Sequence, residues 1–258
     1  MKRNLTFQVQ KKVSGSFSLG KILVLMFNYR FQSLMRLPIK ILMITLLIIS
    51  VGFAEVKPRI LIIGDSISIG YFPFVKYALA NKAEVIHNPG NAQHTGTGLK
   101  NLEEWVGNED WDIIQFNWGL WDLCYRHPDS KRYGNRDKER GTLTFTVEEY
   151  AANMDSIVTL LKTITDAKLI FVTTSYVPEN EGGRYLNDAI RYNEAALKIM
   201  QKHSVEMNDI YEKSAAIHQK FGKGSDDVHF TEKGYKKLSK LIIQPLKKEL
   251  KNTLRSSR

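Results

Sequence analysis

The chain has 258 residues, of which 43% are hydrophobic, with a single cysteine and a formal net charge of +10. That charge would suit a nucleic-acid-binding protein. However, residues 1–54 contain eight Lys or Arg and no Asp or Glu, and the remaining 29 basic residues nearly balance the 27 acidic ones. We therefore expect no nucleic-acid partner, and the lone Cys124 excludes an internal disulfide.

The first 54 residues have the pattern of a targeting region. Residues 35–40 include two basic residues, an apolar run follows over 41–53, and Gly52 and Ala54 are small. This arrangement is typical of a secretory signal peptide, and the run is short for a membrane span of about 20 residues. We predict a signal peptide over 35–54, an over-extended reading frame over 1–34, and a secreted or periplasmic protein. An uncleaved signal anchor is the alternative, and it would be the only link to a membrane.

From residue 55 onward, short apolar runs alternate with segments of helical periodicity. We expect strands over 60–63, 83–87, 111–117, 168–174 and 205–210. We expect helices over 74–81, 97–106, 147–164, 186–203, 211–221 and 231–251, with Thr146 and Thr231 as possible N-caps. Wholly apolar strands that alternate with helices predict a five-stranded parallel sheet covered on both faces, a three-layer α/β/α sandwich. We favour the flavodoxin-like strand order.

The stretch from Arg59 to Gly70 organises this domain. Apolar residues 60–63 run into a Gly-Asp-Ser corner, Gly64-Asp65-Ser66. A serine at this corner lies at the carboxyl edge of the sheet. Open α/β sheets bind ligands at this edge, and backbone N–H groups are available there as donors. Our hypothesis is that Ser66 attacks an ester.

One segment interrupts the alternation of strands and helices. Residues 123–143 form a long, charged stretch after the third expected strand, so it should lie over the same edge as Ser66. Loops of this length are usually functional or disordered. A solvated surface loop is one interpretation, and a substrate-facing lid that favours polar or anionic groups is the other.

An activated serine needs a base within hydrogen-bond reach and a third group that orients the base. His229 stands in Asp226-Asp227-Val228-His229-Phe230-Thr231, directly before the last expected helix. Asp226, three residues earlier, is placed to accept from the imidazole. An Asp-x-x-His pair is common by chance, so spacing alone also allows an ordinary loop.

Together, Gly64-Asp65-Ser66, Gly119-Leu120-Trp121-Asp122 and Asp226-x-x-His229 resemble the blocks of the SGNH/GDSL family of serine esterases and lipases. The resemblance covers about residues 57–250 and assigns 55–258 to one hydrolase domain. It implies a flavodoxin-like fold, ester hydrolysis without a cofactor, Ser66 as nucleophile, His229 as base and Asp226 as its partner. No cluster of Cys, His or Asp has metal-ligand spacing, so we expect no metal.

Two blocks depart from the family pattern. Gln93 stands where the family usually has a glycine whose N–H enters the oxyanion hole, and Trp121 replaces an asparagine donor. We expect oxyanion donors from the Ser66 and Gln93 N–H groups, and from Asn117, whose side chain shares the face of Gly119 by the two-residue period. Asp65 and Trp121 are candidate substrate contacts.

The favoured function is an exported serine esterase that removes a short acyl group, such as acetyl, from a small-molecule or carbohydrate ester. The replacement of the asparagine by Trp121 leaves a second reading open, a non-catalytic carbohydrate- or acyl-binding module on the same fold. A small-cofactor binder that uses the 64–70 turn as an anion site is a third.

Overall fold

Five short strands pair side by side into a parallel sheet in the order β2-β1-β3-β6-β7. The computed structural model describes residues 57–256, so the predicted signal peptide and the segment before it lie outside the described residues. The strands are β1 (Arg59–Ile63), β2 (Glu84–His87), β3 (Ile113–Phe116), β6 (Lys168–Val172) and β7 (Glu206–Asn208). This is the flavodoxin-like order, and the predicted fold class is confirmed.

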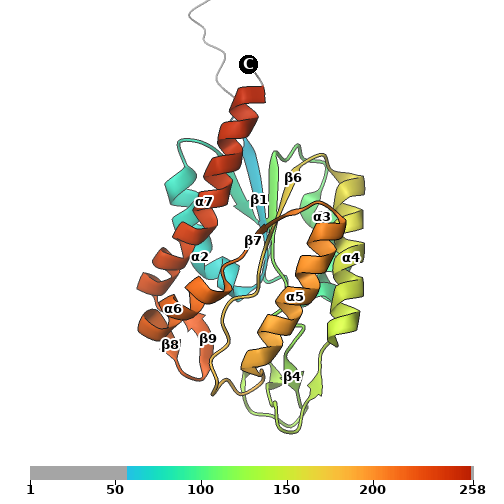
Figure 1. Ribbon diagram of the computed structural model, residues 1–258, viewed down its shortest axis with the longest axis vertical. Coiled ribbons are helices and arrows are strands. Elements are labelled where there is room, and N and C mark those ends of the chain that lie inside the picture. Colours follow the sequence, from blue (N-terminus) through green and yellow to red (C-terminus); the bar gives the residue numbers. More distant parts are fainter. Residues whose placement is uncertain (1–56, 257–258) are drawn as a thin grey trace, which may run out of the picture. The chain divides into compact units, whose positions relative to one another are not determined.

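Helices of the described residues cover both faces of the sheet (Figure 1). Helices α2, α6 and α7 lie on one face, and α3, α4 and α5 lie on the other. Their bounds are α2 (Ser66–Leu79), α3 (Thr95–Val106), α4 (Val147–Ile164), α5 (Leu186–Lys202), α6 (Tyr211–Phe221) and α7 (Glu232–Ser256). Among these described helices, none combines the length and apolar character needed to cross a membrane.

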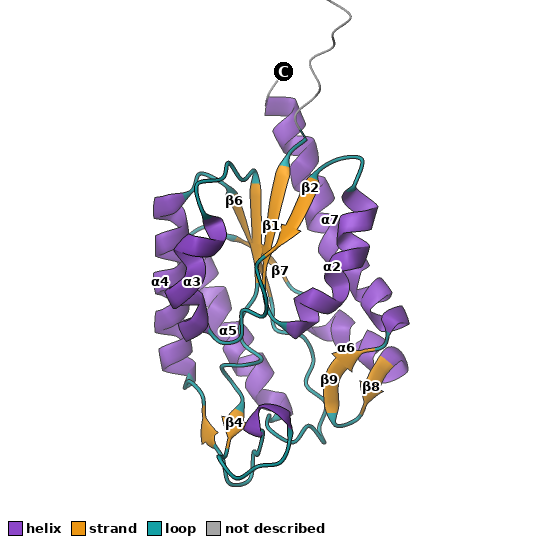
Figure 2. Cartoon of the chain, turned by 180° about the vertical axis from the view of Figure 1, so that it is seen from behind, coloured by secondary structure: helices purple, strands orange, loops and turns teal. Residues whose placement is uncertain are grey.

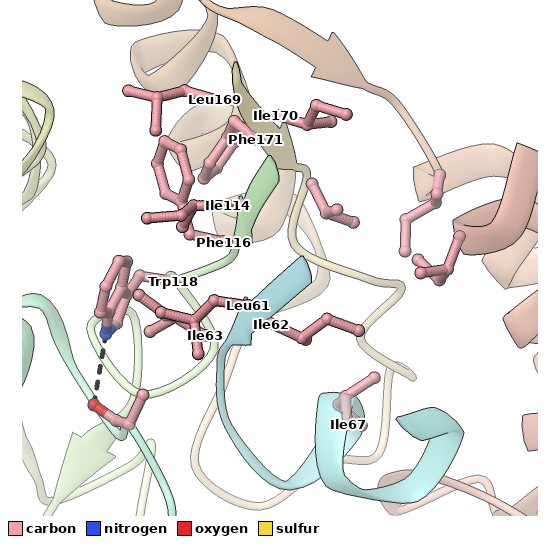
Figure 3. Packing of buried hydrophobic residues seen from close by; sticks show 14 of the residues in the cluster. Leu61, Ile62, Ile63, Ile67, Ile114, Phe116, Trp118, Leu169, Ile170 and Phe171 are labelled. Carbon is pink, nitrogen blue, oxygen red and sulfur yellow. Dashed lines mark hydrogen bonds between the residues drawn. The ribbon is translucent and has the colours of Figure 1, made fainter. Parts of the chain in front are cut away.

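The core of the domain comes from strands that are buried on both faces. Leu61 and Ile63 point to the side where Trp118 lies, whereas Ile62 points to the other side (Figure 3). The Trp118 indole, itself fully buried, donates from Nε1 to the Ala92 carbonyl at 3.2 Å. Burial on both faces explains why the strand sequences are continuous apolar runs rather than alternating ones.

Helix α2 begins at Ser66, eight residues earlier than the segment expected from residue 74. Asp65 is its N-cap, and its Oδ1 accepts from the Ile67 N–H at 2.9 Å. Gly70 and Pro73 make the start of this helix hard to predict from the sequence, because both residue types are disfavoured in helix interiors. Gly70 has a packing role, since a Cβ there would lie 2.2 Å from the Tyr235 ring of α7.

Two small hairpins at the carboxyl end of the sheet were not predicted (Figure 2). The segment over 123–143 contains β4 (Tyr125–Arg126), a 3-10 turn (Tyr133–Asn135) and β5 (Thr142–Leu143). The second hairpin joins β8 (Gly222–Gly224) to β9 (Asp227–Phe230), directly before α7. Strands of two to four residues carry too little periodicity to be predicted from sequence.

Gly119, just beyond β3, has a backbone that only glycine adopts without strain. Its φ is +142°, and a Cβ would lie 2.0 Å from Thr174 Oγ1. We expect Gly119→Ala to lower the free energy of unfolding by about 3 kcal/mol, from backbone strain and overpacking together. Gly90→Ala is the matched control, because Gly90 also has positive φ (+67°) but has nothing within 4 Å. Urea unfolding of both variants measures the difference, and equal losses would show that packing against Thr174 contributes nothing.

Candidate active site

The Ser66 hydroxyl lies at the corner where β1 ends and α2 begins. Ser66 is the first residue of α2, so its N–H is among the first-turn donors that have no partner inside the helix. The corner is held from β2 as well, because the Gly64 N–H donates to Asn88 Oδ1 at 2.9 Å. A nucleophile, a free backbone donor and the positive end of a helix therefore coincide at one point.

His229 lies on β9, far from Ser66 in the sequence, and its side chain contacts that of Ser66. Its Nε2 is 2.9 Å from Ser66 Oγ, and its Nδ1 is 2.5 Å from Asp227 Oδ1. The same carboxylate oxygen accepts from the His229 backbone N–H at 3.0 Å. These bonds to His229 outweigh the effect of burial and lower the pKa of Asp227. A carboxylate, an imidazole and a hydroxyl thus form one hydrogen-bonded chain.

The expected partner of His229, Asp226, is not in this chain of hydrogen bonds. Asp226 is exposed in the turn between β8 and β9, whereas Asp227 is the first residue of β9. Side chains two residues apart on a strand share a face. Asp227 and His229 therefore point together, and the correction from Asp226 to Asp227 follows from the segment being a strand rather than a helix-like turn.

A second histidine, His218, supports this arrangement from α6. It is buried, and its Nε2 donates to the Asp227 backbone carbonyl at 2.7 Å. A Cβ on Gly222 would lie 2.5 Å from the His218 ring, so a glycine is needed where β8 begins. His218 therefore fixes the backbone of β9 from α6.

The Gln93 N–H, expected as an oxyanion donor, has a partner within its own block. Gln93 has the left-handed φ of +50° that glycine adopts freely, in keeping with a position where the family usually has glycine. Its N–H is not free, because it donates to Asn91 Oδ1 at 2.8 Å. Asn91 itself lines the pocket beside Ser66 and Asp65, and Gln93 does not. Sequence reasoning missed Asn91.

Asn117 is not placed as the expected oxyanion donor. Its Nδ2 donates to the Val172 carbonyl of β6 at 2.7 Å, and the residue is not among those that line the pocket. In a regular strand, the Asn117 side chain would lie on the same face as Gly119. However, β3 ends at Phe116, so the two-residue period no longer applies beyond it.

Of the two expected substrate contacts, both line the pocket but only Trp121 is partly exposed. Asp65 is 1% exposed, and its Oδ1 is used as the cap of α2. Its burial raises the pKa of this carboxyl, against the effects of the Ile67 N–H and of Arg184. Asp65 thus stabilises the start of α2 and is not exposed to a substrate. Trp121 provides an aromatic face in the pocket.

The pocket at this corner is small, and most of the residues that line it are polar or charged. Its volume is about 260 Å³, below the 300–1,000 Å³ that is common for ligand pockets. The segment over 123–143 contributes Arg126, Tyr133, Gly134 and Arg136 to the wall, so it does lie over the edge that holds Ser66. The remaining lining residues are Asp65, Ser66, Asn91, Leu120, Trp121, Arg184, Asp227, Val228 and His229.

Residues 62–237 match the model of the GDSL-like lipase/acylhydrolase family, which is more than half of the chain. The chain belongs to this family. Membership makes it a carboxylic ester hydrolase, and the sequence resemblance to the SGNH/GDSL family is confirmed. A search of curated proteins finds no match.

Solved structures of similar fold include several esterases. A lipase/acylhydrolase from Enterococcus faecalis is 22% identical, with a TM-score of 0.57 over 74% of this chain and 95% of the other. An acetylxylan esterase from Geobacillus stearothermophilus is 17% identical, with a TM-score of 0.58 over 76% and 96%. A further acetyl xylan esterase is 16% identical, with a TM-score of 0.56 over 71% and 97%. At these identities the likeness establishes the shared fold.

The hydrolase has no group of three or more His, Cys, Asp or Glu side chains arranged to hold a metal ion within residues 57–256. The titratable groups near Ser66 are instead engaged with backbone donors or with one another. The serine, imidazole and carboxylate side chains at this corner are groups that can perform proton transfer and nucleophilic attack.

Asp122, the last residue of the third block, ties that block to the start of α3. Its Oδ1 accepts from the Thr95 N–H at 2.9 Å and from Thr95 Oγ1 at 2.5 Å, while Oδ2 is buried without a partner in the described part of the hydrolase. Burial raises the pKa of Asp122 to about 7. The folded state therefore holds a proton here that the unfolded chain, with an Asp pKa of about 3.9, releases earlier.

This pKa predicts that the hydrolase loses stability as pH rises. A folded pKa above the unfolded value stabilises the protein at low pH, and the gain disappears between about pH 4 and pH 7. We expect Asp122→Asn to flatten the decline in unfolding free energy over this range. Urea unfolding at intervals from pH 5 to pH 8 measures it. A variant whose profile runs parallel to that of the wild type would show that Asp122 is ionised throughout.

Proposed function

We propose that this hydrolase is an exported serine esterase that removes a short acyl group, with acetyl on a carbohydrate as the preferred case. The observation that carries the proposal is the continuous chain of hydrogen bonds from Asp227 through His229 to Ser66. A base placed on the hydroxyl and oriented by a carboxylate is the arrangement that activates a serine. Export rests on the signal-peptide pattern over 35–54.

In the proposed reaction, Ser66 Oγ attacks the acyl carbonyl and its proton passes to His229 Nε2. The Nδ1–H of His229 donates to Asp227, whose negative charge stabilises the imidazolium that forms. When the tetrahedral intermediate collapses, the ester C–O bond breaks and His229 returns the proton to the leaving alcohol. Water, activated by the same imidazole, then releases the acid and restores Ser66.

The oxyanion of the intermediate needs donors that point into the pocket. The Ser66 N–H at the start of α2 is one. The Asn91 side chain is the second that we propose, because its Oδ1 already accepts from Gln93 and its Nδ2 remains for the substrate. The Asn91 amide, from the second block, would then take the role of the third-block asparagine, whose position Trp121 occupies in this sequence.

The size and lining of the pocket favour a short acyl group. A volume of about 260 Å³ leaves little room for a fatty acyl chain. Trp121 and the largely exposed Tyr133 provide aromatic faces at the pocket, which suit a sugar ring. Two of the solved structures of similar fold are named acetylxylan esterases, and they lend support to an acetylated carbohydrate as substrate.

The test of this proposal is a comparison of two adjacent aspartates. We expect Asp227→Asn to lower kcat on a chromogenic acetyl ester by about 10⁴-fold, the size seen when a triad aspartate is replaced by its amide. Asp226→Asn, one residue away and exposed, serves as the matched control and should retain wild-type turnover. Ser66→Ala should lose the reaction, and acetyl esters should be hydrolysed faster than long-chain ones.

Two outcomes would contradict the proposal. Equal losses in both aspartate variants would show that the Asp227–His229 contact does not orient the base. Negligible hydrolysis by the folded wild type, no faster than by Ser66→Ala, would favour the non-catalytic binding module, and binding of acetylated sugars would then be measured instead.

The oxyanion assignment has its own test. We expect Asn91→Ala to lower kcat by about 10²–10³-fold with a small change in KM, because the donor acts on charge that develops in the transition state. Asn117→Ala is the comparison, since its amide holds the Val172 carbonyl; its main effect should be on stability. Steady-state kinetics and urea unfolding separate the two. Undiminished turnover in Asn91→Ala would assign the donor elsewhere.

A further inference from the structure

Three arginines line the pocket that contains Ser66. Arg126 and Arg136 come from the segment over 123–143, and Arg184 comes from the loop before α5. These segments are joined by backbone bonds, with the Tyr125 N–H donating to the Gly183 carbonyl at 2.7 Å. The convergence is therefore built into the fold rather than made by loose surface side chains.

Two of the three arginines share one carboxylate. Glu181 is fully buried, and its Oε1 accepts from Arg136 Nη1 at 2.5 Å and from Arg184 Nη1 at 3.1 Å. Its other oxygen accepts from the Gly183 N–H at 2.8 Å. Glu181 holds both guanidinium groups in place but neutralises only one of their two charges.

The third arginine, Arg126, has no carboxylate partner among the described residues. Its guanidinium donates to the Gly134 carbonyl and to Thr144 Oγ1, and it lies 4.6 Å from the centre of the Trp121 ring. Burial lowers the pKa of Arg126, and the positive charges of Arg184 and Arg136 lower it further. Arg126 therefore contributes to this wall a positive charge that no carboxylate of the described residues contacts directly.

Donors remain available on this wall. A guanidinium has five N–H groups, and within the described chain Nη2 of Arg126, Arg136 and Arg184 makes no hydrogen bond to protein. Within the described chain, the nearby carboxyls of Asp227 and Asp65 make no salt bridge to these arginines, since Asp227 contacts His229 and Asp65 caps α2. Fixed guanidinium groups with free N–H donors match the geometry of a carboxylate.

We propose that Arg126, Arg136 and Arg184 form a subsite for an anionic group on the alcohol part of the ester, with the carboxylate of an acidic sugar as the ligand that fits best. The subsite rests on the proposed function for its place in the reaction, since it names the class of ester that Ser66 would meet. Trp121 lies against Arg126, so a sugar ring seated on the indole would bring its carboxylate to the arginines.

The experiment compares two esters that differ in one group. An acetylated methyl glucuronoside and the matching acetylated methyl glucoside carry the same acetyl group, and only the first has a carboxylate. We expect the full-length protein to hydrolyse the glucuronoside with a kcat/KM about tenfold to a hundredfold higher, the range of a charged hydrogen bond. Added salt should reduce this preference, because it screens the attraction.

Variants locate the preference. Arg126→Gln should lower the glucuronoside-to-glucoside ratio of kcat/KM about tenfold or more, and Arg126→Lys should retain part of it. Lys131→Gln is the matched control, because it removes one positive charge from an exposed position of the same segment outside the pocket. If Arg126→Gln fails to fold, Arg136→Gln replaces it, since Arg184 still pairs with Glu181 in that variant.

The outcomes separate this subsite from the proposed function. Ser66-dependent hydrolysis of both esters at equal kcat/KM would overturn the subsite and leave the esterase intact. If neither ester is hydrolysed, binding of methyl glucuronoside is measured by calorimetry: binding that Arg126→Gln abolishes would support the subsite without the esterase. No binding by the wild type, or an equal loss of preference in Lys131→Gln, would overturn it.

Discussion

The contact between His229 and Ser66 is the interaction on which the site depends, and it joins residues 163 positions apart. Closing so long a loop has a large cost in chain entropy, so the contact cannot hold its own ends together. The sheet holds Ser66 because β1 lies between β2 and β3. The packing of α7 on α2, with Gly70 against Tyr235, brings β9 and its histidine back to the same corner.

The surroundings of this corner lower the pKa of Asp227 and raise the pKa values of two other carboxyls, those of Asp65 and Asp122. Asp65 and Asp122 are buried, and burial raises the pKa of both. Asp227 is half exposed and accepts two bonds from His229, which lower its pKa. A carboxylate that orients a general base must stay negative at neutral pH. Of these three acids, Asp227 is the one whose pKa its surroundings lower.

The sequence predicts most of the fold because buried parallel strands and long amphipathic helices have strong local patterns. Helices α4 and α6 begin and end where periodicity places them, and the predicted cap Thr146 begins α4. Contacts that depend on short, irregular segments were not predictable in this way. Asp227, rather than the expected Asp226, contacts His229 because the four residues of β9 form a strand. The Asn117 side chain bonds to β6 because β3 ends before this residue.

Catalysis and recognition are carried by different parts of this domain. The proposed triad comes from the corner after β1 and from β9, whereas the arginines come from the segment between β3 and α4 and from the loop before α5. The pairing of Glu181 with Arg136 and Arg184 joins those two loops to each other without involving Ser66, His229 or Asp227. Loops on a rigid scaffold can change while the scaffold persists. Selection of the ester can therefore vary in this fold while the hydrogen-bonded chain at Ser66 is kept.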